Sequence, residues 1–193
     1  TKIIRGHTAK TKEEFRKAIE NKEWDTLFIR KPVHANEFVY TPAGTVHGIE
    51  GQLMMAEVQQ SSDVTYRIYD YDRKDANGNT RELHIDKACN VTNIPHREPE
   101  ISLNVTLVQG NEVIEYVNTE YFRVTRYKIE EEITIQNSRY SLCLPLSGNG
   151  VLNINGVDYD IHAGIGFIVT SGVKVYSIKG NVDLLVSEPP KEK

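Results

Sequence analysis

Two stretches of the chain decide the fold: residues 36–47 (NEFVYTPAGTVH) and residues 164–175 (GIGFIVTSGVKV). Each begins with a residue that accepts a positive φ angle at low cost, Asn36 or Gly164, and continues into a short apolar run. Each run then reaches a tight turn with a second glycine and enters a new strand-like segment. This internal repeat indicates that the two segments share one local backbone plan.

Length and composition set limits on what such a protein binds. The chain has 193 residues, of which 39% are hydrophobic and 26% charged, enough for one large domain or two small barrels with cores of their own. Its formal net charge of −4 argues against nucleic acid as a partner, because phosphate binding normally leaves a basic surface. No apolar run approaches the roughly 20 residues that span a bilayer, so no membrane partner is expected.

The cysteines and the first residues bear on localisation. Cys89 and Cys143 lie far apart and form no C-x-x-C pair, so we interpret them as reduced structural thiols of a cytoplasmic protein. Residues 1–7 contain no apolar signal segment and resemble the end of a strand, so we expect the chain to begin within a domain.

Helices are predicted near the N-terminus and before the middle of the chain. Thr11 and Glu14 form a capping box, and Phe15, Ala18 and Ile19 follow at helical spacing. A second short helical turn is expected around residues 24–28, and one short helix over residues 83–91.

Strands are predicted through most of the remaining sequence. The hairpin signal Asn155-Gly156, flanked by alternating apolar residues, is the strongest, because a type I′ turn needs positive φ at both central positions. The polar stretch 93–100 carries two prolines and is interpreted as a domain boundary. The expected strands cover residues 38–40, 52–59, 65–71, 102–108, 113–117, 121–129, 152–154, 157–161, 167–169, 173–178 and 182–186, with an exposed loop at 72–80.

The repeat resembles the second conserved motif of the cupin superfamily, G-x5-P-x-G-x2-H, whose histidine binds a metal inside a small barrel. The first copy retains Pro42, Gly44 and His47, whereas the second has Val175 at the histidine position. The resemblance implies a mostly β fold: a partial metal-binding cupin-like jelly-roll barrel with a small helical segment at residues 1–97, and a complete barrel without metal ligands at residues 98–193.

A second resemblance, to the type I mannose-6-phosphate isomerases, rests on residues 57–73 (EVQQSSDVTYRIYDYDR) and 81–84 (RELH). It is close from residue 3 to about residue 92 and looser over the C-terminal barrel. It implies a zinc-dependent enzyme that interconverts mannose 6-phosphate and fructose 6-phosphate through an enediol.

Five residues match positions of the family's site, and the resemblance implies their roles. His47 matches a zinc ligand and Arg67 the catalytic arginine; Glu57 and Asp63 match pocket carboxylates, and Arg73 a cation that meets the substrate. Since a guanidinium stays charged at any working pH, we expect Arg67 to stabilise an enediolate or orient the sugar, not to act as a base. We further expect His47 and Arg67 to face one cavity.

Structural alternatives remain open for the same residues. His47 could be a hydrogen-bonded turn histidine, and Arg67 a surface arginine paired with Asp70 or Asp72. Arg73 could simply be solvated, and Asp63 could form a turn.

One histidine cannot hold zinc, which usually needs at least three protein ligands and a water. The remaining ligands are expected upstream of residue 1, in an N-terminal segment that would be the chain's main partner besides the sugar-phosphate substrate. The chain alone is therefore expected to bind zinc weakly and to be inactive. Two alternatives are a non-catalytic cupin that binds sugar phosphates and a structural or oligomerisation domain.

Overall fold

The computed structural model describes residues 1–62 and 64–190, and the chain divides into two compact units. The first comprises Thr1–Glu57 and Ser61–Glu100, the second Val58–Gln60 and Ile101–Lys193. Most of the regular structure is strand, which confirms the predicted class.

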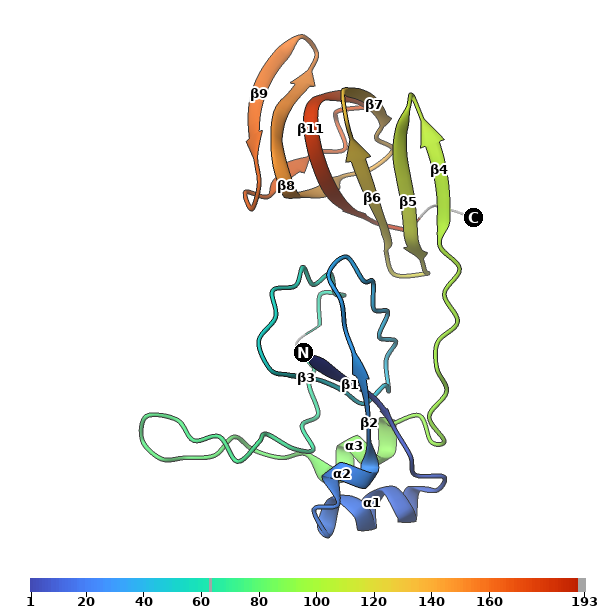
Figure 1. Ribbon diagram of the computed structural model, residues 1–193, viewed down its shortest axis with the longest axis vertical. Coiled ribbons are helices and arrows are strands. Elements are labelled where there is room, and N and C mark those ends of the chain that lie inside the picture. Colours follow the sequence, from blue (N-terminus) through green and yellow to red (C-terminus); the bar gives the residue numbers. More distant parts are fainter. Residues whose placement is uncertain (63, 191–193) are drawn as a thin grey trace. The chain divides into compact units, whose positions relative to one another are not determined.

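The first unit is built on a three-stranded antiparallel sheet of order β2-β1-β3 (Figure 1). The strands are β1 (Lys2–His7), β2 (Phe28–Pro32) and β3 (His47–Glu50). β1 is the central strand, and its pairing with β3 places Arg5 opposite His47.

Three helices complete the first unit: α1 (Lys12–Glu20), α2 (Trp24–Leu27) and α3 (Ile85–Val91). The Thr11 hydroxyl accepts the Glu14 N–H at 3.1 Å, as predicted, while the Glu14 carboxylate accepts from the Lys10 N–H and not from the cap residue itself. Phe15 and Ile19 are buried together with Leu27 against β1, so the apolar face of α1 forms the core of this unit. No helix in the described part of the chain has both the length and the apolar character needed to cross a bilayer.

Three of the strand predictions are wrong. Residues 38–40, 52–59 and 65–71 adopt no regular structure where they are described, although their sequences alternate as strands do. Alternation specifies which side chains share a face, but a strand also needs a partner with free backbone groups. β1 already pairs on both edges, with β2 and β3, and the three segments form no ladder with the outer edge of β2 or β3 where they are described.

The second unit is a jelly roll of eight strands, β4 to β11 (Figure 1). Side chains from β5 to β11 form one core, in which Ile133, Ile178 and Leu184 are fully buried. The strands are β4 (Asn104–Val108), β5 (Asn111–Asn118), β6 (Arg123–Ile129), β7 (Glu132–Gln136), β8 (Ser141–Ile154), β9 (Val157–His162), β10 (Phe167–Val169) and β11 (Val175–Glu188).

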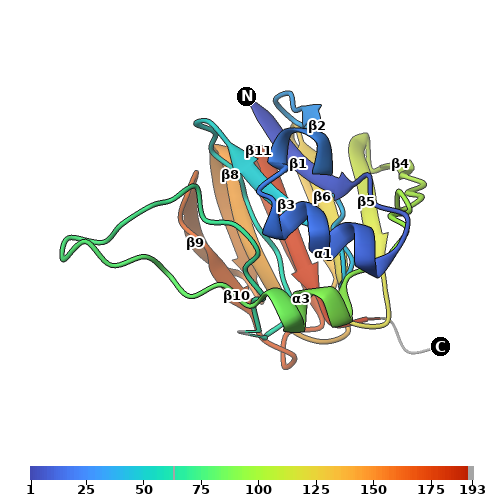
Figure 2. The same ribbon diagram turned by 90° about the horizontal axis from the view of Figure 1, so that it is seen from below.

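Two long strands connect the layers of this barrel. β8 and β11 pair with each other along most of their length, and each changes its other partner partway. β8 pairs first with β10 and then with β9, while β11 pairs first with β7 and then with β6; Figure 2 shows β8, β11, β6 and β5 side by side. The sequence predicted two strands at 173–178 and 182–186, but β11 is continuous, because Gly180 bends it at a φ of +133° without ending it.

The repeat and the predicted hairpin are visible in the backbone. Asn155 and Gly156 have φ angles of +52° and +82°, which confirms the turn between β8 and β9. Asn36 and Gly164 both have positive φ, at +67° and +78°. In both copies a strand begins at the position of the motif histidine, β3 at His47 and β11 at Val175.

The crossing of β8 and β11 generates a prediction about Gly148. Its φ is +79°, and a Cβ atom there would lie 2.0 Å from the Asn181 carbonyl oxygen, whereas Gly156, with a φ of +82°, has no atom within 4 Å of a Cβ. Gly148→Ala should therefore destabilise the fold by about 2–4 kcal/mol, and Gly156→Ala by about 1–2 kcal/mol, since only the first adds a backbone clash to the left-handed strain. Equal losses in urea unfolding would show that the close crossing does not restrict this position.

Candidate functional site

The turn that leads into β3 is held against the end of α3, by Asn93 just after the helix and by close contact with Val91. The Asn93 N–H donates to the Gly44 carbonyl at 2.9 Å, and its side-chain amide donates to the Ala43 carbonyl at 3.0 Å. A Cβ atom on Gly44, whose φ is +79°, would lie 2.7 Å from the Val91 carbonyl oxygen. Glycine is therefore needed at position 44 for two reasons: the backbone has a positive φ angle, and there is no room for a side chain beside the Val91 carbonyl.

His47 is the first residue of β3 and its side chain is exposed. Its Nδ1 lies 2.9 Å from the Thr45 carbonyl oxygen. A carbonyl can only accept, so this contact assigns the hydrogen to Nδ1 and leaves the Nε2 lone pair available. This is the arrangement in which an outer carbonyl orients a metal-binding histidine.

The strand register separates the two faces around His47. Side chains alternate along β3, so His47 shares a face with its partner Arg5, while Gly48 belongs to the opposite face. There a Cβ atom on Gly48 would lie 3.4 Å from the Tyr71 hydroxyl. The segment that carries the candidate arginines thus contacts β3 on the face opposite His47. No contact among the described residues joins Arg67 to His47, so the expectation that they face one cavity stays a prediction.

Asp70 organises that segment. Its side chain is only 7% exposed, and its carboxylate accepts from Arg73 at 2.7 Å and from both Nε and Nη2 of Arg81. These hydrogen bonds, with Arg81 the largest contributor and Arg73 next, lower the pKa of Asp70 to about 2 against the opposing effect of burial.

Arg67 is half-buried beside this carboxylate. Its Nε lies 3.9 Å from Asp70, and its Nη1 donates to the Glu82 carbonyl at 3.4 Å. Its backbone exchanges hydrogen bonds with His84, because the Arg67 N–H donates to His84 Nδ1 and the Arg67 carbonyl accepts the His84 N–H at 2.7 Å. The alternative pairing of Arg67 with Asp70 is present only as a long contact, which leaves the guanidinium available for other partners.

The turn that follows is strained. Tyr71 and Asp72 both have left-handed φ angles, +55° and +51°, without being glycine. The Asp70 carbonyl accepts from the Arg73 N–H at 3.1 Å and closes the turn, and the Arg73 guanidinium lies over the Tyr71 ring. Such strain costs about 1–3 kcal/mol per residue and tends to occur at functional sites.

The structure gives no support for the roles predicted for the two carboxylates, Glu57 and Asp63. Glu57 is exposed and lies in an irregular segment, so the strand expected at residues 52–59 is wrong at this position. Asp63 lies outside the described residues. Their roles toward a substrate stay predictions, as does that of Arg73, which is largely exposed but paired with Asp70.

The sequence suggested Asp70 only as a possible partner of Arg67 and suggested no role for Arg81. The available signal was the Asn77-Gly78 loop, across which Lys74 pairs with Thr80. An antiparallel return at that loop brings the acidic residues before it close to the basic residue after it, so an ion pair of Asp70 with Arg81 could have been anticipated.

The described residues supply one candidate metal donor and not a complete site. Among residues 1–62 and 64–190, no three His, Cys, Asp or Glu side chains are grouped so that they could hold a metal ion. His47 fits a ligand by its free Nε2, but further donors would have to be added to it.

Comparison with known proteins identifies the relatives of this chain. Residues 112–189 match the family model for the cupin domain of mannose-6-phosphate isomerase. The chain is 38% identical over 97% of its length to a probable mannose-6-phosphate isomerase, GmuF, of Bacillus subtilis, and 36% identical over 96% to the mannose-6-phosphate isomerase of Streptococcus mutans. It spans 60% and 58% of the lengths of these relatives.

A solved structure agrees with these relatives. The crystal structure of a mannose 6-phosphate isomerase from Bacillus subtilis superimposes with a TM-score of 0.87 at 33% identity, covering 97% of this chain and 60% of that one. The predicted cupin fold is thereby confirmed.

The Asp70 cluster predicts a pH dependence. Because the pKa of Asp70 falls from 3.8 to about 2 on folding, its ion pairs should contribute stability fully above about pH 4 and lose it as the pH falls through about 2. Carboxyl-detected NMR, with the signal assigned by its loss in Asp70→Asn, should show a midpoint near 2. A midpoint near 3.8 in the folded protein would mean that Arg73 and Arg81 do not hold the carboxylate.

Proposed function

We propose that this chain, related along nearly all of its length to mannose-6-phosphate isomerases, supplies part of the active site of such an enzyme. The observation that carries the proposal is the hydrogen bond from His47 Nδ1 to Thr45, which prepares Nε2 as a metal donor at the motif position. The reaction interconverts mannose 6-phosphate and fructose 6-phosphate.

This reaction moves a proton between C1 and C2 of the sugar through an enediol. It requires a base, groups that stabilise the developing negative charge on oxygen, and an anchor for the phosphate. A bound zinc ion would polarise the sugar carbonyl as a Lewis acid. In this chain, His47 would hold the ion through Nε2, with its ring orientation fixed by Thr45.

The arginines meet the remaining electrostatic requirements. Arg67 would stabilise the enediolate or orient the sugar, because its charge is permanent and only loosely paired with Asp70. Arg73 would meet the substrate from the turn that Asp70 closes, and Glu57 and Asp63 would contribute carboxylates. Asp70 is a positioning residue, since it contacts Arg73 and Arg81 and is itself buried.

The remaining zinc ligands would come from a protein segment that precedes residue 1. Residues 1–193 alone would then bind zinc weakly and lack activity, whereas the natural gene product that contains them would be active in the cytoplasm. The two buried free thiols, Cys89 and Cys143, are compatible with that compartment.

Replacing His47 tests the metal assignment. In the natural gene product, His47→Gln should lower zinc content and lower isomerase activity by at least roughly 10–100-fold, the range found when even an outer partner of a metal ligand is lost. The control His34→Gln changes an exposed histidine of the same unit and should leave both unchanged. Metal analysis and a coupled assay with mannose 6-phosphate, with and without chelator, measure the two quantities.

Two outcomes would contradict the proposal. Full activity of His47→Gln, or a gene product that binds mannose 6-phosphate without converting it, would each exclude the role assigned here. The second outcome would support the alternative of a non-catalytic sugar-phosphate binder.

Replacing Arg67 tests the stabilisation of charge. Arg67→Lys keeps the charge but loses the planar fork, so kcat should fall roughly 10²–10³-fold, as for removal of one oxyanion donor, with a smaller change in KM. Arg97→Lys, at an exposed position of the same unit, is the matched control. A rise in KM with an unchanged kcat would assign Arg67 to substrate binding only.

A further inference from the structure

The barrel of the second unit contains a cavity that the isomerase proposal does not use. Its volume is about 410 Å³, within the range of small-molecule sites. Apolar side chains of Val113, Ile133 and Ile135 form part of its lining, and Arg123 and Glu188 contribute charged groups. All of these residues belong to the unit that lacks the motif histidine.

The charged groups form a buried pair across two strands. Arg123 and Glu188 are direct partners in the register of β6 and β11, and the Arg123 guanidinium donates through Nε and Nη2 to Glu188 Oε2. Both side chains are largely buried, at 14% and 9% exposure. Burying such a pair is costly unless its remaining hydrogen-bonding capacity is satisfied.

Within residues 1–62 and 64–190, the second oxygen of Glu188 has only the Ser141 hydroxyl as a donor. The Asn137 amide nitrogen donates to the carbonyls of Thr170 and Val173, so its Oδ1 must act as an acceptor. The Ser141 hydroxyl lies 2.9 Å from Asn137 Oδ1 and 3.2 Å from Glu188 Oε1. One hydroxyl has one hydrogen, so it satisfies only one of these acceptors at a time, and the shorter contact is to Asn137.

Glu188, which carries this weakly satisfied acceptor, lines the cavity beside an apolar wall. Tyr127 also lines it, and burial together with the nearby Glu188 charge raises the pKa of Tyr127 to about 12, so its hydroxyl stays protonated and can donate. Gln136 and Thr134 add polar groups. A sugar ring combines hydroxyl donors at its edge with C–H groups on its faces, which matches this lining.

We propose that the cavity of the second barrel binds a neutral, monosaccharide-sized polyol, with one ligand hydroxyl donating to Glu188 Oε1. A neutral ligand is favoured because the Arg123 guanidinium already faces two carboxylates, Glu188 and, at 3.7 Å, Glu115. An anion would lie against the donor-poor oxygen of Glu188. Since Arg139 also lines the cavity, inorganic phosphate is the competing probe.

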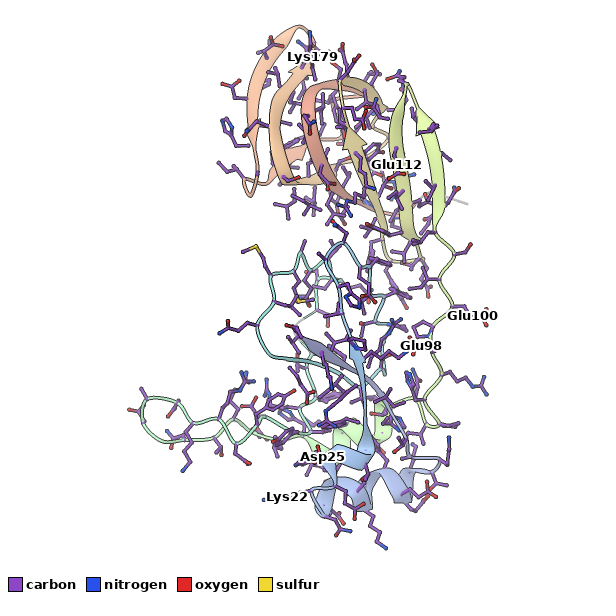
Figure 3. All side chains as sticks on the ribbon, viewed as in Figure 1. Lys22, Asp25, Glu98, Glu100, Glu112 and Lys179 are labelled. Atoms are coloured by element: carbon purple, nitrogen blue, oxygen red, sulfur yellow. The ribbon has the colours of Figure 1, made fainter. Side chains whose placement is uncertain are left out.

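The test is a titration of the full chain with mannose, mannitol and inorganic phosphate, followed by amide NMR shifts. A neutral polyol should produce saturable shifts at residues 134–136, with a roughly millimolar Kd. Glu188→Gln should weaken binding about tenfold, since a hydrogen bond to a charged group is lost. Glu112→Gln, on β5 and labelled in Figure 3, is the matched control and should leave binding unchanged.

A second variant keeps the proposal testable if Glu188→Gln does not fold. Tyr127→Phe should weaken polyol binding by roughly threefold to tenfold, as expected for one neutral hydrogen bond, while Tyr159→Phe on the exposed β9 should not. Absence of polyol shifts at 134–136, tighter binding of phosphate than of polyol at these amides, or equal binding by Tyr127→Phe and wild type would overturn the proposal. Because the readout is binding to the second unit, its failure is distinct from a failure of the isomerase assignment.

Discussion

The site in the first unit depends on the backbone contact between Gly44 and the end of α3. The chain passes so close to the Val91 carbonyl that a Cβ atom on Gly44 would lie 2.7 Å from it, and Asn93 holds the turn through two hydrogen bonds. The Asn93 carbonyl in turn lies 3.0 Å from Nε2 of the buried His7. One asparagine thereby links β1, α3 and the turn, and these fix where β3 begins and where His47 points.

The sequence predicted best what is determined locally. Thr11 caps α1, Asn155 and Gly156 form the hairpin turn, and His47 begins a strand, because each depends on a few neighbouring atoms. The strands expected at 52–59 and 65–71 fail because pairing is a non-local property. The continuity of β11 was missed for the same reason. A glycine in a strand pattern suggests that the strand ends, but Gly180 stays paired with β8 and lies close to Asn149.

The candidate site was anticipated unevenly. His47 could be found because its motif is contiguous, whereas Asp70 becomes significant only when Arg73 and Arg81 come together on it across a loop. Burial is also hard to foresee from alternation: Glu57 is exposed, while Asp70, between two tyrosines, is buried. The strained pair Tyr71 and Asp72 has only a weak sequence signature, because aspartate tolerates the left-handed region but tyrosine does not favour it.

The two copies of the repeat illustrate how one backbone plan accommodates different chemistry. At equivalent strand starts, one copy has an imidazole with a free Nε2 and the other has Val175. The second barrel places its polar groups elsewhere, in the half-buried Arg123 and the buried Glu188 and Ser141. The copy with valine at the motif position therefore belongs to the unit whose cavity is lined in part by hydrogen-bonding groups.

The most direct measurement is long-range ¹H–¹⁵N NMR of the His47 ring in the natural gene product, before and after zinc is added. The proposed metal site predicts a hydrogen on Nδ1 throughout, because Thr45 accepts it, and a zinc-dependent shift of Nε2 alone. A ring protonated on Nε2, or one whose nitrogens do not respond to zinc, would contradict it.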